Sequence, residues 1–182
     1  DVVARLRRIL HTTKIGHSGT LDPNATGVLL VLIGKACKAL PFLEDTDKEY
    51  VATLQLGMRT ISDDIWTDPL EEAPIQPIDD FQGVLDSFRG VQKQVPPMIS
   101  SVRVNGRKLY EYAREGKEVT RPEREVTIYD IEALDASKLM FRVSCSSGTY
   151  VRSLCHDIAR KTGNLGCMSS LVQIGRASCR ER

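Results

Sequence analysis

GHSGTLDPNATG, residues 16–27, is the most specialised stretch of this 182-residue sequence and the starting point for predicting its fold. Three glycines, two threonines, a serine and a proline surround one histidine, His17, and one carboxylate, Asp22. Pro23 biases Asp22 away from helical backbone, while the glycines permit tight turns or the close approach of a ligand. An apolar run follows at residues 28–33. The pattern predicts an ordered loop that holds Asp22 beside a buried strand.

The loop is open to three chemical interpretations. The plainest is a turn capped by Asp22, the usual role of an isolated Asp-Pro. A second is a hydrolase, because the G-x-S-x-G nucleophile elbow is nearly matched around Ser18, with Asp22 and His156 as partners. The fifth position is Thr20, however, and residues 10–15 do not form the strand that an elbow needs. A third is an aspartyl-phosphate enzyme, but no second carboxylate stands two residues after Asp22.

Hydrophobic spacing predicts the elements in the rest of the chain. Helices are expected at residues 2–10, 35–43, 81–88, 107–115 and 149–161. Strands are expected at residues 28–33, 49–56, 91–95, 102–104, 124–134 and 138–145. Because helices and strands mix irregularly, we predict an α+β fold with a mixed, mainly antiparallel sheet flanked by helices.

The composition fits one compact domain in a reducing compartment. Hydrophobic residues make up 41% of the chain, which is enough for a single core. The longest apolar run has six residues, far short of the ~20 that span a bilayer, so no membrane partner is expected. The five cysteines lack paired C-x-x-C spacing, which predicts free thiols and no metal site.

The charges are separated along the chain although the net charge is only +1. Residues 62–80 hold seven acids and no base, whereas residues 101–124 hold seven bases against four acids. A basic segment of this kind is typical of a solvated face and is also compatible with nucleic-acid contact. The pattern predicts a bipolar molecule.

Arg152 stands in the first turn of the helix expected at residues 149–161, where a cation opposes the helix macrodipole at a cost of about 0.3–1 kcal/mol. The apolar positions of that helix occupy one face and leave Arg152 directed elsewhere. We expect a carboxylate to offset this cost. Either a distant carboxylate or the nearby Asp157 could do so.

The last nine residues, IGRASCRER at 174–182, abandon the preceding pattern and resemble a translated sequencing-library adapter. We therefore expect the domain to comprise residues 1–173 and residues 174–182 to be a non-native tail.

Four segments together resemble one known family. They are GHSGTLDPNATGVLLVLIGKACK, DKEYVATLQLG, PPMISSVRVNGRKLYEYAREGKEV and CSSGTYVRSLCHDIA, which begin at residues 16, 47, 96 and 145. All four are similar, in order and spacing, to motifs of TruB-type tRNA pseudouridine-55 synthases, relatives of dyskerin. The resemblance implies the pseudouridine synthase catalytic fold and isomerisation of a T-loop uridine, at position 55 of tRNA, to pseudouridine. It also implies a flipped-out nucleotide and no cofactor.

The resemblance implies roles for three residues in the chemistry. Asp22 matches the catalytic aspartate, Arg152 the arginine that pairs with it, and Tyr50 the tyrosine that stacks on the flipped base. Excision and rotation of a base require a nucleophile or charge stabiliser in a water-poor site.

Three further matches concern the binding of the RNA. His17 matches the histidine inserted into the T loop, where it would occupy the place that the uridine leaves. Tyr150 and Leu171 match residues of the pocket wall. The implied partner is the T stem-loop of tRNA, and the protein is expected to be a monomer. Its location is expected to be the cytoplasm in a bacterium, or the mitochondrion, plastid or nucleus in a eukaryote.

The chain departs from the family pattern in three places. We expect the opening K-P-x-G-x-[ST] segment, the final strand and any RNA-binding PUA domain to be missing. Residues 60–64 resemble the family's T-x-T-x-D, but Trp66 and an acidic loop follow where a glycine turn is common. An alternative function is therefore a catalytically inactive, RNA-binding fragment of the same family.

Overall fold

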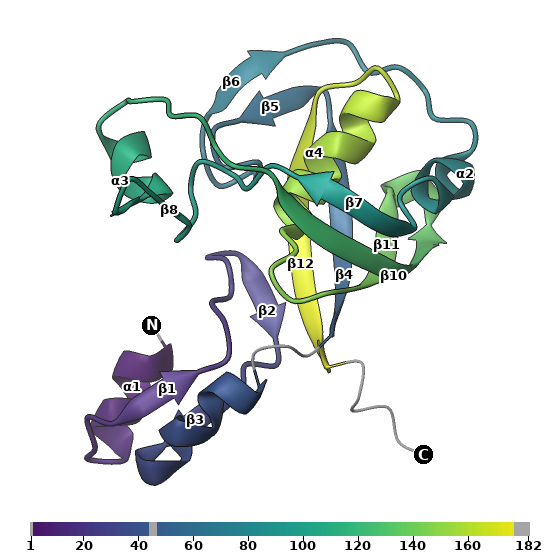
Figure 1. Cartoon of the computed structure of the whole chain (residues 1–182). Coiled ribbons are helices and arrows are strands. Elements are labelled where there is room, and N and C mark those ends of the chain that lie inside the picture. Colours follow the sequence, from purple (N-terminus) through teal and green to yellow (C-terminus); the bar gives the residue numbers. More distant parts are fainter. Residues whose placement is uncertain (1, 44–46, 177–182) are drawn as a thin grey trace, which may run out of the picture.

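The computed structural model describes residues 2–43 and 47–176, and its centre is a six-stranded sheet (Figure 1). The strand order is β2-β12-β4-β11-β10-β7, and every neighbouring pair is antiparallel except β2 and β12. The bounds are Ala25–Gly27 for β2, Gly166–Arg176 for β12, Lys48–Leu56 for β4, Met140–Cys145 for β11, Arg124–Asp135 for β10 and Gly90–Gln94 for β7. The α+β prediction, with a mainly antiparallel sheet, is confirmed.

The remaining elements are short. Three two-stranded pairs join β1 (Ile15–His17) to β3 (Val31–Ile33), β5 (Met58–Thr60) to β6 (Pro69–Glu72), and β8 (Arg103–Val104) to β9 (Arg107–Lys108). The α-helices are α1 (Val2–Ile9), α2 (Phe81–Asp86), α3 (Leu109–Arg114) and α4 (Val151–Lys161), and the 3₁₀ helices are η1 (Gly34–Leu43) and η2 (Ala136–Lys138). Within the described ranges, no helix is long and apolar enough to cross a membrane.

The core lies between the sheet and α4, which packs on β12 and β4. Alternation along β4 buries Ala52, Leu54 and Leu56 on one face of the sheet, as the period of a strand requires. Gly166 allows the helix to approach, because a Cβ at that position would lie 2.4 Å from Cβ of Ala159. This contact holds the last turn of α4 against the start of β12.

The apolar run at residues 28–33 is not the buried strand that the sequence predicts. Only Val31–Ile33 forms a strand, and Val28, Leu30 and Ile33 are each more than a third exposed. Figure 1 shows the reason: α1, β1, β3 and η1 form a group that protrudes from the six-stranded sheet and contributes nothing to its core.

Two further predictions about strands are wrong. The sequence predicts no strand at residues 166–176, whereas the structure has β12 there, a central strand between β2 and β4. The acidic stretch expected to be a loop contains β6, which pairs with β5. Strand β12 also extends through residues 174–176, and Gly175 pairs with Glu49 of β4, so the expected tail begins inside the sheet. Residues 177–182 of that tail lie outside the described residues.

Candidate active site

The loop that carries Asp22 is anchored to β12. The amide of Ala25 donates to the Asp22 carbonyl at 2.9 Å, closing a turn over Pro23. Strand β2 then runs parallel to β12, with Ala25 opposite Leu171. Gly27 comes so close to the neighbouring strand that an added Cβ would lie 2.0 Å from the Gln173 carbonyl oxygen, and its φ is +116°. The sequence therefore needs glycine here to hold Asp22 at the sheet.

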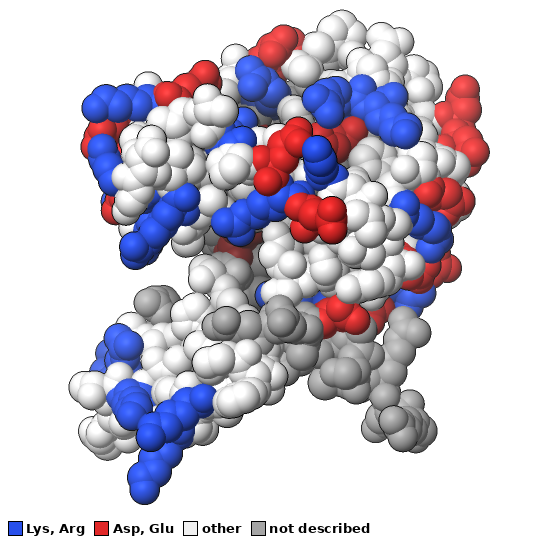
Figure 2. Space-filling model, viewed as in Figure 1, with Lys and Arg blue, Asp and Glu red and all other residues white. Residues whose placement is uncertain are grey.

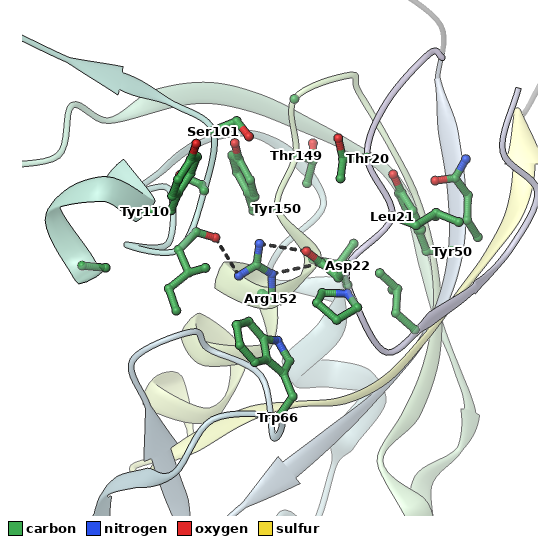
Figure 3. A pocket seen from close by; sticks show the side chains of 18 of the residues that line it. Thr20, Leu21, Asp22, Tyr50, Trp66, Ser101, Tyr110, Thr149, Tyr150 and Arg152 are labelled. Atoms are coloured by element: carbon green, nitrogen blue, oxygen red, sulfur yellow. Dashed lines mark hydrogen bonds and ion pairs between the residues drawn. The ribbon is translucent and has the colours of Figure 1, made fainter. Parts of the chain in front are cut away.

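Arg152 holds the Asp22 carboxylate in a two-point ion pair (Figure 3). Its Nε donates to Asp22 Oδ2 at 3.0 Å, and Nη2 lies 3.0 Å from Oδ1. Its Nη1 donates to the Ser62 carbonyl at 2.8 Å and to the Ile99 carbonyl at 3.1 Å. The side chain of Arg152 is 6% exposed and that of Asp22 is 25% exposed, so the pair is shielded while the carboxylate can still be reached. The alternative partner Asp157 lies instead 3.4 Å from Arg160.

The first turn of α4 is fastened to the end of β7. Buried Gln94 accepts from the Tyr150 amide at 2.8 Å and donates to the Tyr150 carbonyl at 3.0 Å. Ser153 Oγ donates to the Val95 carbonyl at 2.8 Å. These bonds determine where Arg152 points. The sequence did not identify Gln94 as important, because a glutamine in an ordinary strand carries no local signal.

A cavity of about 740 Å³ opens over the ion pair. Five of the six residues singled out from the sequence line it: Asp22, Tyr50, Tyr150, Arg152 and Leu171. Tyr50 and Leu171 are 8% and 6% exposed and form part of its apolar wall. Figure 3 shows Tyr110 and Tyr150 on one side of Arg152 and Trp66 on the other. The cavity thus combines one fixed carboxylate with several flat rings, and its volume is in the usual range for a ligand site.

His17 is the sequence-predicted residue that is absent from the cavity lining. It lies on β1 opposite Val31, and its Nδ1 contacts the carbonyl of Gly19. His17 therefore belongs to the protruding group and not to the pocket wall.

The Tyr50 hydroxyl lies in a desolvated site near Asp22. Desolvation, followed by the proximity of Cys145 and Asp22, raises the pKa of Tyr50 well above its ordinary value of 10.0. A tyrosine of ordinary pKa is already uncharged at neutral pH, and this rise extends the uncharged state to higher pH, so the ring presents an aromatic face beside the carboxylate.

The segment after β5 forms a buried polar support behind Arg152. Thr60 Oγ1 and Ser62 Oγ both donate to the Asp64 carbonyl, at 2.8 and 2.9 Å. Burial raises the pKa of the Asp64 carboxyl, and the amide of Trp66 partly offsets that rise. The same segment supplies the Ser62 carbonyl that Arg152 contacts, so the segment that resembles T-x-T-x-D orients the arginine.

A family model described as "TruB family pseudouridylate synthase (N terminal domain)" matches residues 7–151. The chain belongs to the TruB family. Curated relatives named tRNA pseudouridine synthase B agree with this assignment. The one from Streptococcus gordonii is 44% identical over an alignment 190 residues long, which includes 99% of this chain and 65% of the relative. The one from Bacillus pumilus is 43% identical over 185 residues, which cover 96% and 60%. The chain thus spans less than two thirds of these relatives.

Solved structures contain chains with a fold similar to that of this TruB-family chain. A Cbf5-Nop10-Gar1 complex contains a chain that matches with a TM-score of 0.73 and 32% identity, over 100% of this chain and 46% of that one. An H/ACA RNP bound to a substrate RNA containing 2'-deoxyuridine matches with a TM-score of 0.68 and 29% identity, over 100% and 44%. The family resemblance expected from the sequence is therefore confirmed in both sequence and fold.

Several cavity residues of this TruB-family chain were missed or undervalued from the sequence. Tyr110 and Arg114 lie on α3 and line the cavity, although the sequence predicts only a basic helix within a family motif there. Trp66 was singled out solely as a departure from the family pattern. Ring residues within a polar stretch are a signal of surface recognition that could have identified both aromatic positions.

The described residues contain no group of three or more histidine, cysteine, aspartate or glutamate side chains that could hold a metal ion. Cys145, Cys155 and Cys167 are free and fully buried. Burial raises the pKa of Cys145 and of Cys167 to about 11. These thiols therefore contribute to the core as small apolar groups.

Proposed function

We propose that this chain is the catalytic part of a tRNA pseudouridine synthase that converts the T-loop uridine at position 55 to pseudouridine. The observation that carries the proposal is the two-point Asp22–Arg152 ion pair at the wall of an aromatic cavity. A carboxylate fixed in this way serves as a nucleophile or charge stabiliser without reorganisation during the reaction. The names of the curated relatives support the same reaction class.

The reaction is an isomerisation that needs positioning. The bond from N1 of the base to C1' of the ribose breaks, the base turns, and C5 bonds to C1'. The proton on C5 leaves, and N1 gains one. Asp22 is the proposed catalytic residue for this exchange, and Arg152 orients it. Because the reactants stay in one enclosed site, the detached base is kept from solvent while it turns.

The target base must leave the RNA stack before Asp22 can reach it. We assign Tyr50 to the face of the flipped uracil, and Tyr150 and Leu171 to the wall around it, because all three border the cavity with Asp22. His17 keeps its proposed role of filling the vacated place in the T loop, and this role requires β1 to face the RNA.

The proposed substrate is the T stem-loop of tRNA, bound by a monomer, and the proposed location in a bacterium is the cytoplasm. Figure 2 shows Lys and Arg side chains near α3 and on the protruding amino-terminal group, on both sides of an opening. Within the described part of the chain, Arg103, Lys108 and Arg114 make no ion pair with a carboxylate. By contrast, Arg107 contacts Glu115. The unpaired cations are the better candidates for phosphate contacts.

Tritium release from tRNA labelled at C5 of uridine tests this function, because formation of the C5–C1' bond expels the label. We expect release from a transcript with uridine at position 55 and none when that position is cytidine. If the chain binds the first transcript and releases no tritium, it is an RNA-binding, inactive fragment and the proposed activity is wrong.

A further inference from the structure

Trp66 is the only tryptophan in the chain, and it stands at the edge of the cavity instead of in the core. Its side chain is 37% exposed, and its neighbours Ile61 and Ile65 are 37% and 44% exposed. Figure 3 shows the indole on the opposite side of the Asp22–Arg152 pair from Tyr150. A large ring left accessible beside a reactive carboxylate is placed to meet a ligand.

The loop that carries Trp66 is held by hydrogen bonds at three points. The Trp66 amide donates to Asp64 Oδ1 at 3.3 Å, and the Ile65 amide donates to the Met168 carbonyl of β12 at 3.0 Å. The hydroxyls of Ser62 and Thr67 lie 2.6 Å apart. An indole on a braced loop loses little conformational freedom when a ligand stacks on it, and this favours binding.

The residues around Trp66 determine which chemical group of a ligand can bind against the indole. Asp64, two residues before Trp66, is buried, and Asp68, two residues after it, borders a second, smaller hollow that Trp66 also lines. Carboxylates at this point disfavour a phosphate. The apolar faces of the indole and of Ile61 favour an uncharged flat ring, which in RNA is a base and not the backbone.

We propose that Trp66 is a stacking platform for a second unpaired base of the RNA, next to the target uridine. The inference rests on the proposed function and adds a recognition site to it. Tyr50 and Trp66 line different sides of the cavity, with the ion pair between them (Figure 3). One RNA loop could therefore place the target base on Tyr50 and a neighbouring base on Trp66.

Stacking and phosphate contacts respond differently to mutation and to salt. Loss of one base–aromatic stack typically raises Kd roughly 5- to 150-fold. Stacking neutralises no phosphate, so the slope of log affinity against log salt should stay unchanged. For Trp66→Ala we therefore expect a higher Kd with an unchanged salt slope. We expect Trp66→Phe to recover part of the lost affinity because it keeps a ring.

Fluorescence reports on this site alone, because no other tryptophan contributes. Titration of the chain with a T stem-loop RNA should quench the emission to saturation. In RNAs with one abasic loop nucleotide at a time, one position other than the target uridine should abolish most of the quenching. Leu70→Ala, at a 57% exposed position outside the cavity lining, is the matched control and should bind like the parent. Thermal unfolding of each variant separates loss of binding from loss of fold.

The outcomes distinguish this inference from the proposed function. If the parent converts the RNA while Trp66→Ala binds it within twofold and emission is unchanged on binding, the stacking site is wrong and the function stands. If quenching disappears only when the target nucleotide is abasic, Trp66 contacts the target itself, and the second-base site is overturned. If the parent neither binds nor converts the RNA, the proposed function fails, and this inference fails with it.

Discussion

Replacement of Arg152 by lysine tests the geometry of the site separately from its charge. The guanidinium makes two contacts with Asp22 and donates to the carbonyls of Ser62 and Ile99, all within 3.1 Å. A lysine keeps the positive charge but has one nitrogen on a flexible stem, so it cannot hold both carboxylate oxygens and both carbonyls in one plane.

The magnitude follows from the contacts that would be lost. A buried acceptor left without a donor costs about 1–3 kcal/mol, and the ammonium can satisfy some of the four contacts. We therefore expect Arg152→Lys to lower the free energy of unfolding by about 2–4 kcal/mol, which most domains survive at 25 °C. A misplacement of the Asp22 carboxylate by ~1 Å is enough to lower turnover about 100-fold.

Urea unfolding and single-turnover tritium release measure the two effects separately. Arg160→Lys on the same helix is the control, because that side chain is 75% exposed and lies 3.4 Å from Asp157. It should change the free energy of unfolding by less than about 0.5 kcal/mol. The reasoning is refuted if Arg152→Lys matches this control in stability and turns over within threefold of the parent.

Two further predictions concern RNA binding and pH. Replacement of both Lys108 and Arg114 by glutamate should weaken tRNA binding and flatten the dependence of affinity on salt, because fewer phosphates are neutralised. The control that replaces both Asp79 and Asp80 by asparagine should change neither quantity. If the two double variants behave alike in a filter-binding assay, the inferred separation of charge is wrong. Burial raises the pKa of Cys145 from 9.0 to about 11, so the unfolded thiol ionises first and the free energy of unfolding should fall as pH rises between these values. In urea unfolding at several pH values, the free energy of unfolding of Cys145→Ala should decrease less with pH than that of the parent. An equal decrease in the two proteins would show that the Cys145 thiol does not contribute to the pH dependence.

The sequence predicted the strongly periodic elements and singled out several residues that line the cavity. Strand β4 alternates cleanly, and α4 has one apolar face, so their positions were predictable. The cost of a cation in the first turn of α4 correctly indicated that Arg152 has a carboxylate partner, and the structure identifies that partner as Asp22.

The missed elements lack a simple period or depend on distant contacts. Strand β12 has irregular register near Ser170 and Gly175, which interrupts the alternation that identifies a strand. The run at residues 28–33 is apolar enough for a core strand, but its placement in the protruding group leaves it largely exposed. The role of Gln94 depends on tertiary contact with Tyr150, which has no local pattern in the sequence.

The substitution Asp22→Asn tests the central claim most directly, because it removes the charge of the carboxylate and nearly preserves its shape. The assay is tritium release from tRNA labelled at C5 of uridine, with tRNA affinity and thermal unfolding measured on the same preparations. We predict that the parent releases the label, while the variant loses at least 1,000-fold in rate, on the order seen when a nucleophile is removed, and keeps its fold and most of its affinity. Release by a folded Asp22→Asn variant within tenfold of the parent would contradict the assignment of Asp22 as the catalytic residue.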